Sequence, residues 1–154
     1  MRKLEKLSVI IPARNEAENL EKCVKGIDVE LARKGIEREI LVVDDGSTDS
    51  TQSVLSRLAR EFDSVRSVRN EGENGFGRAI RLGLQESTGD AMAIMMADLS
   101  DSPQDLVRYW EKLGEGFECV FGSRFLPSSR VTDYPPAKLV ANRIVNTAIR
   151  YAFK

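Results

Sequence analysis

The stretch EILVVDDGSTDST, residues 39–51, decides the fold of this chain. It begins with a continuous run of aliphatic residues, which is typical of a strand buried on both faces of a sheet. The run passes directly into the polar segment 44–49, and residues 54–58 then show apolar side chains at helical spacing. Ser47 or Asp49 is the expected N-cap of that helix. The stretch therefore predicts one strand–loop–helix unit of an α/β protein.

The same alternation continues on both sides of this stretch. Short apolar runs predict four more strands, at residues 8–11, 65–69, 91–96 and 119–122. Amphipathic patterns predict further helices, at residues 20–31, 79–84 and 137–153 and from Pro103 onward. Gly35 offers a stop for the first of these helices. Strands that alternate with helices indicate βαβ units, so we expect an α/β fold with a mainly parallel central sheet flanked by helices.

Composition narrows the classes of protein that fit. A chain of 154 residues, 42% of them hydrophobic, is long enough for one sizeable core. The chain has 23 Lys and Arg against 24 Asp and Glu, so it lacks the excess of basic residues that would predict a nucleic-acid partner.

Histidine is absent from the sequence, which removes the commonest general base and the commonest zinc ligand. Cys23 and Cys119 lie in apolar patterns and are expected to be buried free thiols of a reducing, cytoplasmic compartment. No run of about 18 apolar residues predicts a transmembrane segment within residues 1–154.

Polar clusters follow four of the predicted strands, at residues 12–16, 44–49, 98–101 and 123–124. In open α/β sheets, ligands bind in the crevice beyond the carboxyl ends of the strands. Four polar loops at one edge of a sheet therefore predict a ligand site there.

The acidic residues of these loops also have a structural interpretation. Asp44, Asp45 and Asp49 could simply cap the next helix, and for these three residues the sequence supports helix capping and a functional role equally. Asp98 and Asp101 could likewise cap the helix that follows them. Two neighbouring carboxylates at the end of an apolar strand are nevertheless costly without a cation. Oxygen ligands alone favour Mg²⁺ or Mn²⁺ over zinc, and a nucleotide diphosphate would complete the metal's shell.

Two common phosphate-binding motifs are missing. The chain has no GxxxxGK[ST] sequence and no GxGxxG after the first strand. The segment NGFGR, residues 74–78, could contact a diphosphate through its backbone N–H groups, or it could be a plain turn.

Five segments in this order and spacing resemble the family 2 glycosyltransferases, especially the polyprenyl-phosphate branch typified by dolichol-phosphate mannosyltransferase. They are SVIIPARNEAENL, EILVVDDGSTDST, NGFGRAIRLGLQESTGD, MMADLSDSP and FGSRF. The resemblance implies a GT-A nucleotide-diphospho-sugar transferase fold, a metal-dependent donor site, and inversion at the anomeric carbon. The donor would be of the GDP-mannose or UDP-glucose type.

By position, the resemblance implies nucleotide contacts for Pro12, Arg14 and Glu16 in the first loop. Arg14 stands where many members have an aromatic residue. The resemblance also implies base and ribose contacts for Val42 and Asp44 at the end of the second strand, and Asp45 lies beside them.

The family's Asp-x-Asp metal motif corresponds here to Met96, Ala97 and Asp98, so the first carboxylate is missing. Asp98 is the implied principal metal ligand and a catalytic residue. Asp101 would compensate directly or through water, and Ala97 and Ser100 belong to the same donor-binding stretch.

The C-terminal part is expected to meet the acceptor. Arg124 matches the arginine of the family's Gly-Ser-Arg motif and could hold phosphate oxygens in bidentate fashion, the alternative being a surface ion pair. The helix at residues 137–153 has apolar residues with basic residues between them, which suits an anionic membrane surface. It equally suits packing on the sheet or on another subunit, as in a homo-oligomer. The resemblance favours the membrane, with Lys138 and Arg143 joining Arg124 at the acceptor phosphate and the protein peripheral on the cytoplasmic face.

A polyprenyl phosphate acceptor would explain the lack of a convincing catalytic base. Its phosphate oxygen is already ionised, so positioning and charge neutralisation would supply most of the catalysis. A saccharide hydroxyl would need a base, and Asp101 is the candidate.

Two other classes of protein are alternatives. A nucleotidyltransferase would carry a glycine-rich basic loop after the first strand, which residues 12–16 do not form. A binding module without turnover would fit the missing carboxylate at Met96. The expected layout is a nucleotide-sugar-binding catalytic region at 1–125, then an acceptor loop and amphipathic helix at 126–154 of the same domain, with the native protein continuing further.

Overall fold

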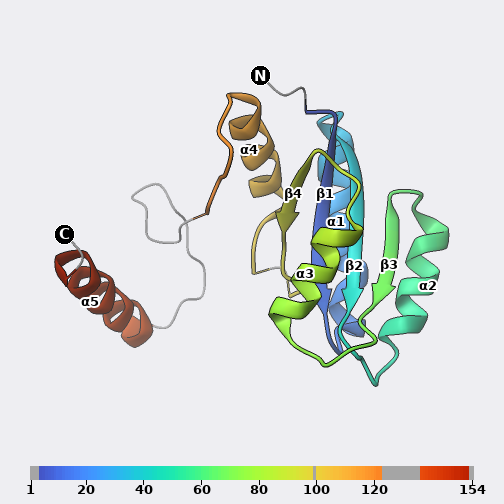
Figure 1. Ribbon diagram of the computed structural model, residues 1–154, viewed down its shortest axis with the longest axis horizontal. Coiled ribbons are helices and arrows are strands. Elements are labelled where there is room, and N and C mark those ends of the chain that lie inside the picture. The colour runs from blue at the N-terminus through green and yellow to red at the C-terminus, as the bar shows by residue number, and fades with distance from the viewer. Residues whose placement is uncertain (1–3, 99, 123–135, 153–154) are drawn as a thin grey trace. The chain divides into compact units, whose positions relative to one another are not determined.

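The computed structural model describes residues 4–98, 100–122 and 136–152, which fall into two compact units, Met1–Val120 and Phe121–Lys154. The first unit contains a four-stranded sheet of order β3-β2-β1-β4 in which every pair is parallel (Figure 1). Its strands are β1 (Lys6–Ala13), β2 (Glu37–Asp44), β3 (Val65–Arg69) and β4 (Ala91–Ile94). Its helices are α1 (Ala17–Arg33), α2 (Thr51–Glu61), α3 (Phe76–Glu86) and α4 (Pro103–Gly114). The predicted α/β class and parallel sheet are confirmed.

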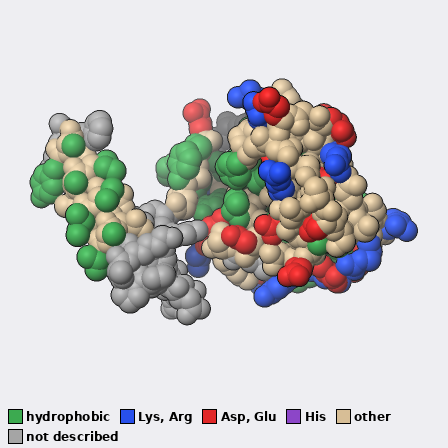
Figure 2. Space-filling model, turned by 90° about the horizontal axis from the view of Figure 1, so that it is seen from below, with side chains coloured by type: hydrophobic (Ala, Val, Ile, Leu, Met, Phe, Trp, Pro, Cys, Tyr) green, Lys and Arg blue, Asp and Glu red, His purple; other side chains and the backbone are tan. Residues whose placement is uncertain are grey.

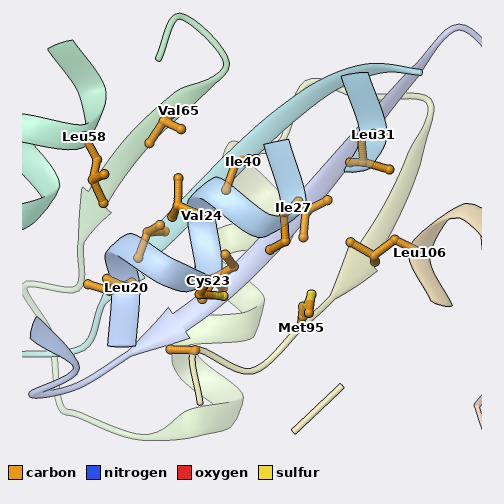
Figure 3. Close-up of a cluster of buried hydrophobic side chains, with 14 of the residues drawn as sticks. Leu20, Cys23, Val24, Ile27, Leu31, Ile40, Leu58, Val65, Met95 and Leu106 are labelled. Carbon is orange, nitrogen blue, oxygen red and sulfur yellow. The ribbon is translucent and has the colours of Figure 1, made fainter. Parts of the chain in front are cut away.

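Helices cover both faces of the sheet. Helices α1, α2 and α4 pack on one face over a large apolar cluster, part of which is drawn in Figure 3. Leu20, Cys23, Val24, Ile27 and Leu31 of α1 are all fully buried there, as their helical spacing predicted. Helix α3 packs on the other face over a smaller cluster of buried side chains from β1, β2 and itself, namely Ile10, Leu41, Val43 and Ala79. Successive side chains of β1 point to opposite faces of the sheet and so contribute to both apolar clusters.

The ends of the helices follow local rules in most places. After α1, Gly35 has φ 65° and donates its N–H to Ala32 O at 2.9 Å, which confirms the predicted stop. Pro103 opens α4 as expected. The predicted N-cap of α2 is wrong, because the cap is Ser50 and its side chain makes no capping bond. Asp49 Oδ1 accepts the Thr51 N–H at 2.9 Å and satisfies that donor instead.

The last part of the first unit differs most from the expectation. β4 ends at Ile94, and Met92 and Ile94 are 47% and 49% exposed because α3 covers β1 and β2 rather than this strand. The strand predicted at 119–122 is wrong, since these residues have no regular secondary structure. Cys119 is exposed, which corrects its expected burial. An apolar run becomes a strand only where a neighbour offers backbone partners, and no described strand pairs with this one.

A buried carboxylate joins the amino ends of the strands. Glu39 on β2 accepts hydrogen bonds from Ser8 Oγ at 2.5 Å, Arg66 Nε at 2.6 Å and Thr88 N at 2.9 Å. Burial alone would raise its pKa, but these hydrogen bonds outweigh burial and lower the pKa to about 2. Ser8 Oγ also accepts the Gly89 N–H at 2.8 Å, so one network fastens β1, β2, β3 and the turn before β4.

The second unit contains helix α5 (Pro136–Ala152). Four aliphatic side chains on it are more than half exposed, namely Val140, Ile144, Val145 and Ile149. Within the described residues, neither α5 nor any other helix has the length and hydropathy that a bilayer crossing requires.

Candidate functional site

The polar segments 12–16, 44–49 and 98–101 all lie at or beyond the carboxyl ends of strands, at one edge of the sheet. The strands run toward the lower edge of Figure 1, and Ala13, Asp44 and Arg69 lie in register across β1, β2 and β3. On the other side of β1, Met95 N donates to Ile10 O at 3.0 Å and leads the loop between β4 and α4, called the fourth loop below, to the same edge. Figure 2 views the molecule from below this edge, where acidic side chains are visible on the surface.

The two consecutive aspartates at the end of β2 are both buried, and both accept hydrogen bonds from the protein. Asp44 accepts the Ser47 N–H at 2.9 Å through Oδ1 and Arg69 Nη1 at 3.2 Å through Oδ2. Asp45 accepts Asn70 Nδ2 and the Gly75 N–H, each at 2.7 Å. Their side chains therefore brace the second loop against the segment after β3.

These bonds decide part of the question that the sequence left open. Neither Asp44 nor Asp45 caps α2, because their acceptor oxygens serve Ser47 and the segment after β3 instead. Ser47, Arg69 and Asn70 were not among the predicted site residues. Ser47 lies within the predicted polar segment 44–49, and only the polar residues at the end of the third strand could have indicated Arg69 and Asn70 from sequence.

The first loop is bonded to the second through three successive backbone N–H groups. Asn15 N donates to Ser47 Oγ at 3.0 Å, Glu16 N to Thr51 Oγ1 at 3.1 Å, and Ala17 N to Asp49 Oδ2 at 3.4 Å. Hydrogen bonds from the side chain and N–H of Thr51 hold the pKa of Asp49 below its usual range. The loops after β1 and β2 are thus one hydrogen-bonded body.

The predicted nucleotide contacts lie in different environments. Pro12 and Val42 are buried at the ends of β1 and β2. Arg14 is exposed, and Glu16 is partly exposed with Oε2 accepting Asn19 Nδ2 at 2.8 Å. The structure leaves Arg14 and Glu16 within reach of solvent, whereas Val42 offers a ligand little side-chain surface.

The fourth loop approaches the first loop over the buried thiol of Cys23. Cys23 Sγ lies 3.7 Å from Met96 O. Burial raises the pKa of this thiol to about 12, and the negative charges of Asp98 and Glu16 add to the rise. Two carboxylates that are 82 residues apart in the sequence therefore act on the same buried group.

Neither Asp98 nor Asp101 caps the helix that follows. The N-cap of α4 is Ser102, whose Oγ accepts the Gln104 N–H at 3.3 Å. Asp98 is exposed, and its Oδ1 accepts the N–H of Ser100, two residues further along the chain, at 2.9 Å. Asp101 is partly exposed, and its charge contributes to the raised pKa of Tyr109, for which burial is the main cause. The capping alternative is wrong for both aspartates.

A divalent cation would find hard oxygen donors in this loop but not a complete protein shell. Ala97 is buried, while Asp98, Ser100 and Asp101 all retain exposed surface. Among the described residues, no three Asp, Glu, Cys or His side chains form a group that could hold a metal. The donor set therefore suits Mg²⁺ or Mn²⁺ only where a ligand supplies further oxygens.

The predicted acceptor residues belong to the second unit. Arg124 lies outside the described residues. Lys138 lies on α5, where its side chain is not described, and Arg143 is exposed on the same helix.

Two hollows of about 320 and 500 Å³ lie on the first unit, at the opposite edge of the sheet. They are lined by residues at the amino ends of the strands, such as Glu5, Glu37 and Arg66, and contain none of the predicted site residues. The chemistry of the polar loops, rather than the shape of the surface, identifies the candidate site.

Comparison with known proteins identifies the family of this chain. The family model described as glycosyl transferase family 2 matches residues 8–154. A dolichol-phosphate mannosyltransferase of Pyrococcus furiosus is 36% identical over 130 residues, which are 84% of this chain and 36% of that protein. An undecaprenyl-phosphate 4-deoxy-4-formamido-L-arabinose transferase of Klebsiella pneumoniae is 35% identical over 118 residues, which are 76% of this chain and 36% of that protein. The chain thus spans about a third of the length of these relatives.

Solved structures give a similar result. Mannosyltransferase PcManGT from Pyrobaculum calidifontis, in complex with GDP-Man and Mn²⁺, matches with a TM-score of 0.53 and 31% identity over 60% of this chain and 27% of that one. Glucosyl-3-phosphoglycerate synthase of M. tuberculosis matches with a TM-score of 0.58 and 26% identity over 71% of this chain and 41% of that one.

Proposed function

Because this chain belongs to glycosyl transferase family 2, we propose that it is the donor-binding part of an inverting hexosyltransferase that moves a sugar from a nucleotide diphosphate to polyprenyl phosphate. Its parallel sheet with helices on both faces is the GT-A architecture that the sequence predicted, which the solved neighbours confirm. GDP-mannose and UDP-glucose are the donor types to test first.

One observation supports the placement of the donor above all others. Met95 N donates to Ile10 O at 3.0 Å, and Cys23 Sγ lies 3.7 Å from Met96 O, so two of the five segments that carry the family resemblance meet at the carboxyl edge of the sheet. The nucleoside would lie against the bonded first and second loops, near Pro12, Arg14, Glu16 and the segment after Val42. The diphosphate would extend toward Ala97, Asp98 and Ser100.

Asp98 and Asp101 would hold Mg²⁺ or Mn²⁺ together with the diphosphate oxygens. The ion, when bound, neutralises the charge that builds on the diphosphate as its bond to the sugar breaks. The likeness to a mannosyltransferase solved with GDP-Man and Mn²⁺ supports this assignment.

The chain's own groups supply positioning rather than acid–base chemistry. Asp44 and Asp45 have their oxygens committed to protein donors, so they shape the loops and do not serve as bases. An ionised acceptor phosphate needs no base, which agrees with a chain that has no histidine. We place Arg124, Lys138 and Arg143 at the acceptor phosphate.

The membrane contact belongs to the same proposal. The exposed aliphatic side chains of α5, from Val140 to Ile149, would enter the interface, with Arg143 at the headgroups. The enzyme would then be peripheral on the cytoplasmic face, where its lipid acceptor is reached.

The test is transfer of label. The protein is incubated with radiolabelled GDP-mannose or UDP-glucose, Mn²⁺ and vesicles that contain polyprenyl phosphate, and lipids are then extracted. We expect lipid-soluble label, reduced about a hundredfold by Asp98→Asn, the scale of losing one preorganised charge contact. Asp105→Asn is the matched control, since Asp105 pairs with Arg108 on α4 and should retain full activity.

Other outcomes would point elsewhere. Label that stays wholly in a water-soluble saccharide would overturn the lipid acceptor and favour a hydroxyl acceptor with Asp101 as base. Donor binding without any transfer would favour a binding module.

A further inference from the structure

Asn15 has the most unusual backbone in the candidate site. Its φ is 56°, and it is the one residue other than glycine with positive φ among those the structure describes. Asparagine tolerates this left-handed conformation better than most residues because its short polar side chain can bond locally, whereas alanine is strained there. The conformation turns the chain sharply between Arg14 and Glu16, two of the proposed nucleotide contacts.

The side chain of Asn15 adds the return bond between the two loops. Its Oδ1 accepts the Thr48 N–H at 2.8 Å, while its own N–H donates to Ser47 Oγ at 3.0 Å. The neighbouring bonds from Glu16 and Ala17 run one way only, from backbone donors of the first loop to side chains of the second. Asn15 thus both donates to the second loop and accepts from it, in addition to the backbone bond from Asp45 N to Ala13 O at 2.8 Å.

We propose that Asn15 is a positioning residue of the donor site, which holds Arg14 and Glu16 in the orientation that the nucleotide requires. This rests on the proposed function of that site. Asn15 Oδ1 is engaged by the Thr48 N–H, so the proposed role of Asn15 is to position its neighbours rather than to bind the donor through that oxygen. It would instead raise the fraction of molecules whose first loop is ready to bind, and the apparent affinity scales with that fraction.

Three substitutions separate its two contributions. Asn15→Gly keeps the left-handed backbone but loses the bond to Thr48. Asn15→Ala loses both. Asn15→Asp replaces the amide oxygen by a carboxylate oxygen that can still accept the Thr48 N–H, and its side chain tolerates the conformation, so it serves as the conservative rescue.

The measurement is the Kd of GDP and UDP with Mn²⁺ by calorimetry, with kcat and donor KM alongside. For whichever nucleotide binds, we expect Asn15→Gly to weaken binding about fivefold, the usual net effect of one hydrogen bond. Asn15→Ala should weaken it by about a further tenfold through the strained backbone. Asn15→Asp should stay within about threefold of the parent on the same scale. The kcat at saturating donor should stay within about twofold in all three, because the reacting groups are untouched.

The outcomes are distinguishable. If the parent protein binds neither nucleotide, the proposed function fails. If the parent binds a nucleotide, and Asn15→Gly and Asn15→Ala each bind it with the same Kd as the parent, the positioning role is overturned and the proposed function stands. A lower melting temperature with unchanged Kd would show that Asn15 is merely structural. Should Asn15→Ala fail to fold, Asn15→Gly and Asn15→Asp still decide.

Discussion

Replacing Glu39 by glutamine tests how the sheet is fastened at its amino edge. The Glu39 side chain is 6% exposed and bonded to Ser8, Arg66 and Thr88, and its pKa is about 2 against 4.5 for a free glutamate. Each pKa unit corresponds to about 1.4 kcal/mol, so the ionised carboxylate contributes about 3 kcal/mol to the free energy of unfolding at neutral pH. Because the folded pKa is lowered, this contribution is complete above pH 4.5 and is lost as the pH falls toward 2.

The assay is urea unfolding followed by circular dichroism between pH 2.5 and 7. We expect Glu39→Gln to lower the free energy of unfolding by about 2–4 kcal/mol at pH 7, since glutamine keeps the shape but not the charge paired with Arg66. The difference from the parent should shrink as the pH falls below 4.5. Glu37→Gln is the matched control, because Glu37 is exposed on the same strand and its replacement should change stability by less than about 0.5 kcal/mol. A Glu39→Gln protein as stable as the parent, or a difference that does not change with pH, would refute the reasoning.

Two further predictions concern packing and thiol chemistry. Gly83→Ala should destabilise the fold by about 1–3 kcal/mol in thermal unfolding, because a Cβ there would lie 2.4 Å from Ile10 Cγ2. Gly77→Ala on the same helix meets nothing within 4 Å and should stabilise by up to about 1 kcal/mol, so an equal effect of both would contradict the packing. Cys119 should react with iodoacetamide in the native protein while Cys23, buried and with its pKa raised to about 12, does not. Mass spectrometry should show one label natively and two in guanidinium, and native labelling of Cys23 would be the contrary result.

The sequence predicted the fold well where one local pattern decides the structure. The continuous run before Asp44 and the helical spacing from Leu20 to Leu31 each depend on neighbours in the chain, and both are confirmed. Residues 119–122 are a similar apolar run, yet they form no strand. A strand also needs a neighbouring strand to pair with, and the run's own residues do not show whether one is available. The strand predicted at 91–96 ends early, at Ile94, for the same reason.

The candidate site was predictable as a location and less so as a set of contacts. The chain order of strands and loops placed the polar segments at one edge, since parallel strands end together. The bonds of Asp44 to Arg69 and of Asp45 to Asn70 join residues 25 positions apart, and no local pattern shows which donors a buried carboxylate will find. The segment GSTDST offers several residues able to cap α2, so pattern alone could not select Ser50.

A thermal-shift screen of nucleotide diphosphates, with and without Mn²⁺, tests the donor site most directly. A ligand that binds only the folded state stabilises it by about 2.7 kcal/mol at a hundred times its Kd. We predict a rise in melting temperature with GDP or UDP that is larger with Mn²⁺, is reduced by Asp98→Ala, and is retained in Asp105→Ala. Melting temperatures that no nucleotide diphosphate changes, with or without the metal, would contradict a donor site at the carboxyl edge of this sheet.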